Sequence, residues 1–173
     1  MTSVDSNSLC LECGLCCDGV LFADVRLQPG DDADRLRALG LPAAKDSKSG
    51  FQKFPQPCPA FQQGRCRIYA DRPMYCRGFE CLLLQKVNDG RVETGVALRV
   101  IGAARRKAEA VKRLLRELGD GDERVALSVR FRRVKKRLES NLRDDHAAEV
   151  FGRLTLAVHD LNVLLSGAFY PGP

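Results

Sequence analysis

Four cysteines within eight residues near the start of the chain are the side chains with the strongest capacity for chemistry. Cys10, Cys13, Cys16 and Cys17 follow the spacing C-x2-C-x2-C-C. Thiolates held this close repel one another as anions, and a bound metal ion or iron–sulfur cluster removes that repulsion. The other cysteines also lie before residue 82, at Cys58, Cys66, Cys76 and Cys81. The pattern therefore predicts metal chemistry in the first half of the chain, with all eight cysteines as candidate metal ligands.

Disulfides are the alternative use of eight cysteines, and they need an oxidising compartment. Residues 1–9 are polar and acidic, without the basic and apolar regions of a secretory signal. No run of about 18 apolar residues predicts a membrane-spanning helix. We therefore expect a cytoplasmic location, where structural disulfides are rare. The sequence favours metal ligation over disulfides and over free redox thiols.

The spacing of the first cysteine group bears on the identity of the metal. Zinc sites usually combine two C-x2-C units across a longer loop. A continuous C-x2-C-x2-C instead provides three ligands of a cubane cluster in bacterial ferredoxins, with the fourth ligand taken from elsewhere. If the chain holds two four-sulfur sites, we expect Cys10, Cys13 and Cys16 to share one with a distal cysteine; a single site with spare sulfurs is the alternative. The spacing favours a 4Fe-4S iron–sulfur cluster, with zinc as the alternative, and the distant His146 and His159 are not expected to be ligands.

The second cysteine group lies among residues that restrict the backbone. The Gln63-Gly64 pair predicts a tight turn that presents Cys66, followed by a short strand over residues 67–69. Asp71 is expected to cap a short helix that carries Cys76. Positive charge accompanies these sulfurs at Arg65, Arg67, Arg72 and Arg77. These arginines would offset the net negative charge of an all-thiolate metal site.

Taken together, these motifs resemble the YkgJ-type CxxCxxCC cysteine-cluster family. The resemblance covers about residues 8–85 and is carried by the block Cys10–Cys17, Cys58-Pro59, Gly64 through Tyr69, and Arg72-Pro73 through Cys76-Arg77. It implies a zinc- or iron-chelating protein, of a kind often described as an iron–sulfur oxidoreductase. Flagellin lysine N-methylases are similar to it at a distance, which implies protein modification as an alternative role. The chain departs from the family pattern at Ala60-Phe61, where a bulky apolar pair is usual.

The elements that must position the cysteines predict an α+β fold that is mainly α. Residues 20–27 alternate as a short strand, residues 31–39 suit a short helix, and residues 42–53 have no apolar period and predict a loop. Apolar residues then recur at helical spacing over residues 96–118, 127–142 and 150–165, with Asp144 and Asp145 at the expected start of the last helix. We therefore expect a cysteine-rich metal-binding region over residues 1–85 with short strands. A basic three-helix antiparallel bundle over residues 86–173 is expected to pack on it in one compact domain.

The net charge of +6 lies entirely in the second half of the chain. Basic residues concentrate over residues 105–116 and 130–137, and such helices attract nucleic acid, acidic proteins or anionic membranes. No recognised nucleic-acid motif accompanies them, which favours solvated helix faces partly paired with nearby glutamates.

Three classes of function therefore remain open. The first is a metal-binding protein, the second a cluster-dependent oxidoreductase or protein-modifying enzyme, and the third a structural-zinc module whose basic helices bind an acidic partner or nucleic acid. No glycine-rich nucleotide loop is present, and no residue is assigned a catalytic role.

Overall fold

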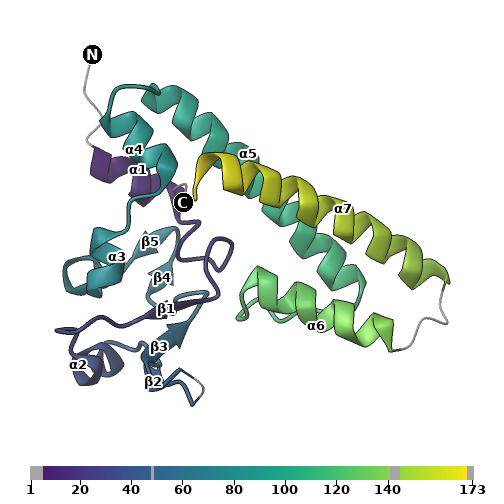
Figure 1. Cartoon of the computed structure of the whole chain (residues 1–173), viewed down its shortest axis with the longest axis horizontal. Coiled ribbons are helices and arrows are strands. Elements are labelled where there is room, and N and C mark those ends of the chain that lie inside the picture. The colour runs from purple at the N-terminus through teal and green to yellow at the C-terminus, as the bar shows by residue number, and fades with distance from the viewer. Residues whose placement is uncertain (1–5, 48, 141–144, 171–173) are drawn as a thin grey trace.

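The chain folds into a strand-containing part that carries the cysteines and a longer helical arm (Figure 1). The computed structural model describes residues 6–47, 49–140 and 145–170. Its elements in chain order are α1 (Ser6–Cys13), β1 (Asp24–Arg26), α2 (Ala33–Ala38), β2 (Ala44–Lys45), β3 (Gln52–Pro55), β4 (Phe61–Gln62), β5 (Arg65–Cys66), the 3-10 helix η1 (Tyr69–Asp71), α3 (Met74–Gly78), α4 (Leu82–Asn88), α5 (Thr94–Glu117), α6 (Leu127–Glu139) and α7 (Asp145–Ala168). The predicted α+β fold, mainly α, is confirmed.

Strands β1, β3 and β2 form an antiparallel sheet in that order. Residues 42–53 contain β2 and the first half of β3, so the prediction of a loop is wrong for those parts. The sequence showed no strand pattern there because Phe54 is the one residue of β2 and β3 whose side chain is buried. The strand predicted over residues 20–27 shortens to the three residues of β1.

The Gln63-Gly64 pair forms the predicted turn and links β4 to β5. Both residues have positive φ, 50° and 76°, as a type I′ hairpin turn requires. The following strand is Arg65–Cys66, two residues earlier than predicted, because Tyr69 begins a 3-10 helix instead. Cys66 therefore lies within the hairpin, where it pairs with Phe61.

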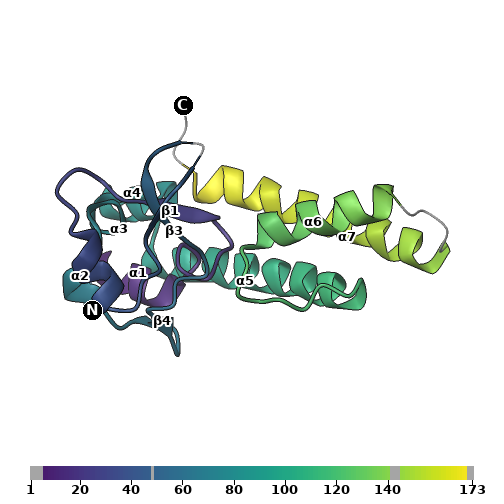
Figure 2. The same cartoon turned by 90° about the horizontal axis from the view of Figure 1, so that it is seen from below.

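The three long helices of the arm lie where the apolar period predicts them. Helices α5 and α7 pack along each other in opposite directions, and α6 packs against both (Figures 1 and 2). Buried alanines at 97, 104 and 108 of α5 leave room for close packing. Leu142 and Asp144, expected at the boundary between the last two helices, lie outside the described residues. No helix in the described part of the chain combines the length and apolarity needed to cross a membrane.

Two hydrophobic clusters hold the molecule together. The larger joins the two halves of the sequence, because Leu15 and Leu21 share it with Leu115 of α5 and Leu154 of α7. The smaller lies beneath the sheet and contains Val25, Leu41, Phe54 and Ile68. The backbone N–H of Leu82 also donates to the carbonyl oxygen of Phe169 at 3.1 Å, which ties the end of α7 to the start of α4.

Candidate metal centre

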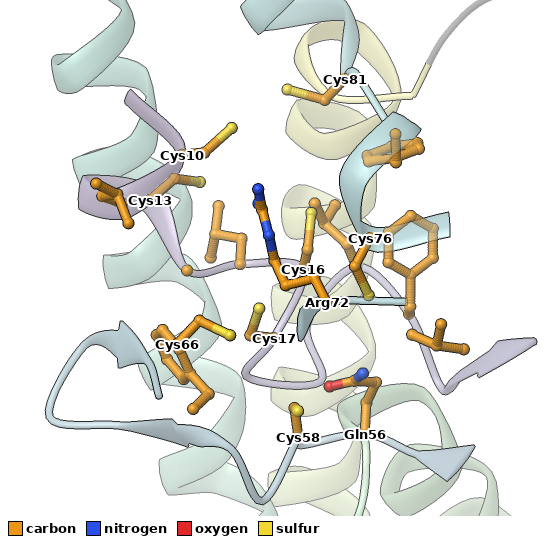
Figure 3. Close-up of a pocket in the computed structure, with 18 of the residues that line it drawn as sticks. Cys10, Cys13, Cys16, Cys17, Gln56, Cys58, Cys66, Arg72, Cys76 and Cys81 are labelled. Atoms are coloured by element: carbon orange, nitrogen blue, oxygen red, sulfur yellow. The ribbon is translucent and has the colours of Figure 1, made fainter. Parts of the chain in front are cut away.

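All eight cysteines line one cavity of about 130 Å³ (Figure 3). Cys10 and Cys13 come from α1, and Cys16 and Cys17 from the turn that follows it. The distal ones are Cys58 after β3, Cys66 in β5, Cys76 in α3 and Cys81 at the start of α4. Segments far apart in the sequence therefore bring every cysteine to one place.

A tight turn after α1 directs Cys16 and Cys17 into the cavity. Gly14 has φ +67°, and a Cβ there would lie 2.4 Å from Cζ of Phe61 in the hairpin. The backbone N–H of Cys17 donates to the carbonyl oxygen of Gly14 at 2.9 Å. Leu15 is fully buried and fixes the turn to the larger core cluster. Only a glycine fits this close approach in the left-handed region of backbone space.

Arg105 of α5 forms hydrogen bonds with the end of α1, just before this turn. Its guanidinium donates two hydrogen bonds to the carbonyl oxygen of Cys13, at 2.7 and 3.2 Å, and one to that of Glu12. These carbonyls belong to the last residues of α1, where no helical partner is available. A residue of the basic stretch at 105–116 therefore secures the C-terminal end of α1.

Asp31 caps α3, the helix that carries Cys76. The backbone N–H of Met74 donates to Oδ1 of Asp31 at 2.8 Å. Asp71, predicted to be the cap, instead forms an ion pair with Arg35 at 2.5 Å. The prediction of Asp71 is therefore wrong, because Asp71 lies in a 3-10 helix whose end is separated from α3.

Cys81 is itself the cap of α4. Its Sγ accepts a hydrogen bond from the backbone N–H of Leu84 at 3.4 Å. Hydrogen bonds from backbone N–H groups favour the charged form of an acceptor sulfur. This interaction holds the side chain of Cys81 at the first turn of the helix.

The sulfurs fall into two groups of four. Cys13, Cys16 and Cys81 pack against the larger core cluster, whereas Cys58, Cys66 and Cys76 pack against the smaller one. The sulfurs that raise the pKa of the remaining two cysteines associate each with one set: Cys81 raises the pKa of Cys10, and the three cysteines of the smaller cluster raise that of Cys17. Cys17 also raises the pKa of Cys16, so the two sets adjoin there. The first group is Cys10, Cys13, Cys16 and Cys81, and the second is Cys17, Cys58, Cys66 and Cys76.

Burial favours the protonated form of several of these thiols in the metal-free protein. It raises the pKa of Cys13, Cys17 and Cys76 to about 12, and it also raises the pKa of Cys16. Repulsion between neighbouring sulfurs acts in the same direction at each of these positions. Removal of the protons therefore requires a positive charge inside the cavity, which a metal ion supplies.

The donor set fits zinc or an iron–sulfur cluster in its chemistry. The described residues that line the cavity include eight cysteines and no histidine, aspartate or glutamate, and thiolates are the soft ligands that both kinds of centre prefer. As the side chains stand, no group of three or more such donors in residues 6–47, 49–140 and 145–170 is arranged to hold a metal ion. Ligation therefore needs side-chain rotation that draws the sulfurs together.

Two polar residues that are not aromatic accompany the sulfurs on the cavity wall. Of the four arginines expected around the second group, Arg72 alone lines the cavity. Its guanidinium stacks 3.5 Å above the ring of Tyr69. The positive charge of Arg72 lowers the pKa of Cys10 and of Cys76, but burial raises the pKa of both by more. Gln56 is the other polar residue, and sequence reasoning missed it because a lone glutamine beside Cys58 carries no ligand pattern.

The basic stretches of the arm are partly engaged within the protein. Arg130 is buried and donates to Oδ1 of Asp120 at 3.0 Å, and Arg133 donates to Oδ2 of the same carboxylate at 2.7 Å. Arg116 forms ion pairs with Glu109 and Glu123. The expectation of solvated helix faces partly paired with glutamates is met at Arg116, whereas Arg130 is buried and its partner is an aspartate of the preceding loop. His146 and His159 lie on α7 and do not line the cavity.

Comparison with protein-family models matches residues 9–94 to a family described as "CxxCxxCC: Putative zinc- or iron-chelating domain". The matched segment contains all eight cysteines and ends at Thr94, where α5 begins. No curated protein and no solved structure matches the chain.

Proposed function

Residues 9–94 belong to the CxxCxxCC family of zinc- or iron-chelating domains, and on that premise we propose that the chain binds metal through its eight cysteines. The cavity is the observation that supports this most, because it gathers all eight sulfurs from separate segments. A cavity lined by soft sulfur donors without carboxylates or imidazoles suits zinc or an iron–sulfur cluster and disfavours hard cations such as magnesium.

The proposal assigns two sites of four thiolates. The first site takes Cys10, Cys13, Cys16 and Cys81, and the second takes Cys17, Cys58, Cys66 and Cys76. Two arguments support this division: three cysteines of each group pack against one core cluster, and four thiolates complete the coordination of a zinc ion or of a cubane cluster. It follows the expected pattern in which three closely spaced cysteines share a site with one distal cysteine.

A 4Fe-4S cluster is the favoured occupant, with zinc as the alternative. The continuous C-x2-C-x2-C spacing supports the cluster for the first site. When bound, an iron–sulfur cluster would supply one-electron chemistry, whereas zinc would supply a structural cross-link. The chain's own contribution is to bury the thiolates, to donate the Leu84 N–H to Cys81, and to place the Arg72 guanidinium beside the sulfurs.

The same proposal places the protein in the cytoplasm, where thiols stay reduced and available to metal.

A cluster-dependent oxidoreductase or modifying enzyme is the second candidate. It requires an open coordination position, so one cysteine would be replaceable without loss of metal. A structural-zinc module that binds nucleic acid or an acidic protein is the third, and the internal ion pairs of Arg116, Arg130 and Arg133 weigh against it.

Metal analysis of the full chain, purified without oxygen, tests the proposal. We expect about two centres per chain, with broad absorbance near ~400 nm and acid-labile sulfide if they are iron–sulfur clusters, or about two zinc ions per chain without colour. A folded protein that is free of metal, and that takes up neither iron with sulfide nor zinc, would contradict it. Binding of nucleic acid that weakens with salt would instead support the third candidate.

A further inference from the structure

Gln56 lines the sulfur cavity and has a buried side-chain carbonyl oxygen without a hydrogen-bond partner among the described residues. Its side chain is 2% exposed, and its carbonyl oxygen Oε1 forms no hydrogen bond with any described residue. The backbone is held in place, because its N–H donates to the carbonyl oxygen of Ala23 at 3.0 Å. Gln56 lies two residues before Cys58 of the second group, and both line the cavity (Figure 3).

An unpaired buried amide is costly, and native proteins rarely keep one without a use. Loss of hydration without a compensating hydrogen bond lowers stability, whereas an apolar side chain of similar size would fill the same space without that cost. The neighbouring chemistry indicates what partner the amide serves. Metal-bound thiolates carry negative charge and accept hydrogen bonds, and the four candidate thiolates of the second group line the same cavity as Gln56.

We propose that Gln56 is a positioning residue of the second site, where its side-chain amide donates an N–H hydrogen bond to a metal-bound thiolate. Rotation of the amide by about 180° about its last torsion exchanges the oxygen and nitrogen positions, and this torsion is broad in glutamine. The inference rests on the proposed function. It adds that the second site has a neutral hydrogen-bond donor in contact with its ligands, and that the donor gains its partner when metal binds.

This role makes opposite predictions for the metal-free and the metal-bound protein. Gln56→Leu removes the unpaired amide, so the metal-free protein should unfold at an equal or higher urea concentration. The same variant should bind metal at the second site about 10–100-fold more weakly, the usual effect of losing a hydrogen bond to a ligand. A residue with only a structural role would instead lower the stability of the metal-free protein.

Titration of the metal-free full chain with Co²⁺ or Zn²⁺ against a chelator tests the inference. The thiolate-to-cobalt absorption of Gln56→Leu should shift in energy at the second site and stay unchanged at the first. Gln56→Glu should bind more weakly still, because a carboxylate repels thiolates. Gln52→Leu is the matched control: Gln52 is exposed on β3, lies outside the cavity lining, and should change neither affinity nor absorption.

Two results would overturn the inference alone. One is second-site affinity in Gln56→Leu within twofold of the unaltered chain, and the other is a metal-free protein that is less stable after the substitution. Failure of the unaltered chain to bind either metal would overturn the proposed function, and this inference with it. The two failures are therefore distinguishable by the titration of the unaltered chain.

Discussion

Cys58 donates its backbone N–H to the carbonyl oxygen of Cys17 at 2.8 Å. This hydrogen bond joins the turn after α1 to the segment after β3, and it links Cys17 to a member of the proposed second group although its neighbour Cys16 is assigned to the first. Two adjacent residues thus point to different groups, and both groups depend on the backbone of one turn.

Single substitutions of the adjacent cysteines should remove different sites. We expect Cys16→Ser and Cys17→Ser each to bind about half the metal of the unaltered chain, because each removes one ligand of one four-thiolate site. The Cys16→Ser/Cys81→Ser double variant should bind as much metal as Cys16→Ser alone. The Cys16→Ser/Cys17→Ser double variant should bind no metal. Metal content measured after anaerobic gel filtration gives these ratios.

The pairing pattern of the double variants decides between one site and two. If Cys16→Ser with Cys81→Ser loses all metal while each single variant keeps half, the division into two groups is wrong. If both single variants lose all metal, the eight sulfurs form one site.

Stability of the metal-free protein should fall at alkaline pH. Burial raises the pKa of Cys17 and Cys76 from 9.0 to about 12, so the folded state holds these protons more tightly than the unfolded state. Their contribution is complete below pH 9.0 and is lost as the pH rises toward about 12. Urea unfolding at about pH 8 and about pH 10.5 should show the decrease, and a Cys17→Ser/Cys76→Ser double variant should show a shallower one. An unchanged or increasing free energy of unfolding would contradict it.

Gly14→Ala should disturb the hairpin as well as the turn. The new Cβ would lie 2.4 Å from Cζ of Phe61, in a residue with φ +67°. Gly64→Ala is the matched control, because Gly64 has φ +76° and nothing within 4 Å of its Cβ position. We expect the control to lose about 1–2 kcal/mol from backbone strain alone. Gly14→Ala should lower the free energy of unfolding by more than the control does. It should also bind metal more weakly, because Phe61 pairs with Cys66. Equal losses of stability in the two variants would show that the contact with Phe61 is not limiting.

The helices and the cysteines were predictable because their signals are local. The apolar period of α5 and α7 is read from neighbouring residues, and the spacing of Cys10, Cys13 and Cys16 brings them together without the rest of the fold. The Gln63-Gly64 turn was likewise specified by its own two residues.

Features that depend on distant contacts were not predictable in the same way. Asp31 caps α3 from 43 residues away and displaces the nearby candidate Asp71. Strand β3 shows no alternation because Phe54 alone is buried, and β3 is defined instead by pairing with β1 and β2. The unpaired amide of Gln56 appears only when the cavity is formed.

Arg105→Ala should increase fraying at the C-terminal end of α1 without affecting the packing of the helical arm. The substitution removes the hydrogen bonds to the carbonyl oxygens of Glu12 and Cys13, and we expect a loss of about 1 kcal/mol in urea unfolding. Cys10 on α1 should also react faster with iodoacetamide as the helix frays. Arg106→Ala, which removes an exposed arginine from the same helix, is the matched control. Equal effects of the two substitutions would show that lost charge, rather than the contact with α1, is responsible.

Asp120→Asn should be the most destabilising conservative change in the arm. The carboxylate is buried between Arg130 and Arg133, and both side chains of the pair Asp120–Arg130 are at most 2% exposed. Replacement by the neutral amide leaves the Arg130 charge buried without its counter-ion, which costs about 3–5 kcal/mol in comparable pairs. The matched control is Asp122→Asn, whose ion pair with the exposed Arg124 is screened by solvent and should contribute far less. Urea unfolding of the metal-free chain measures both.

A second variant separates the cost of a lone buried charge from a general loss of packing. Asp120→Leu combined with Arg130→Met removes both charges together, and it should recover much of the stability lost in Asp120→Asn. Metal content should stay unchanged in all of these variants, because neither residue lines the sulfur cavity. If the double variant is less stable than Asp120→Asn, the ion pair is favourable in its own right and also organises the connection between α5 and α6.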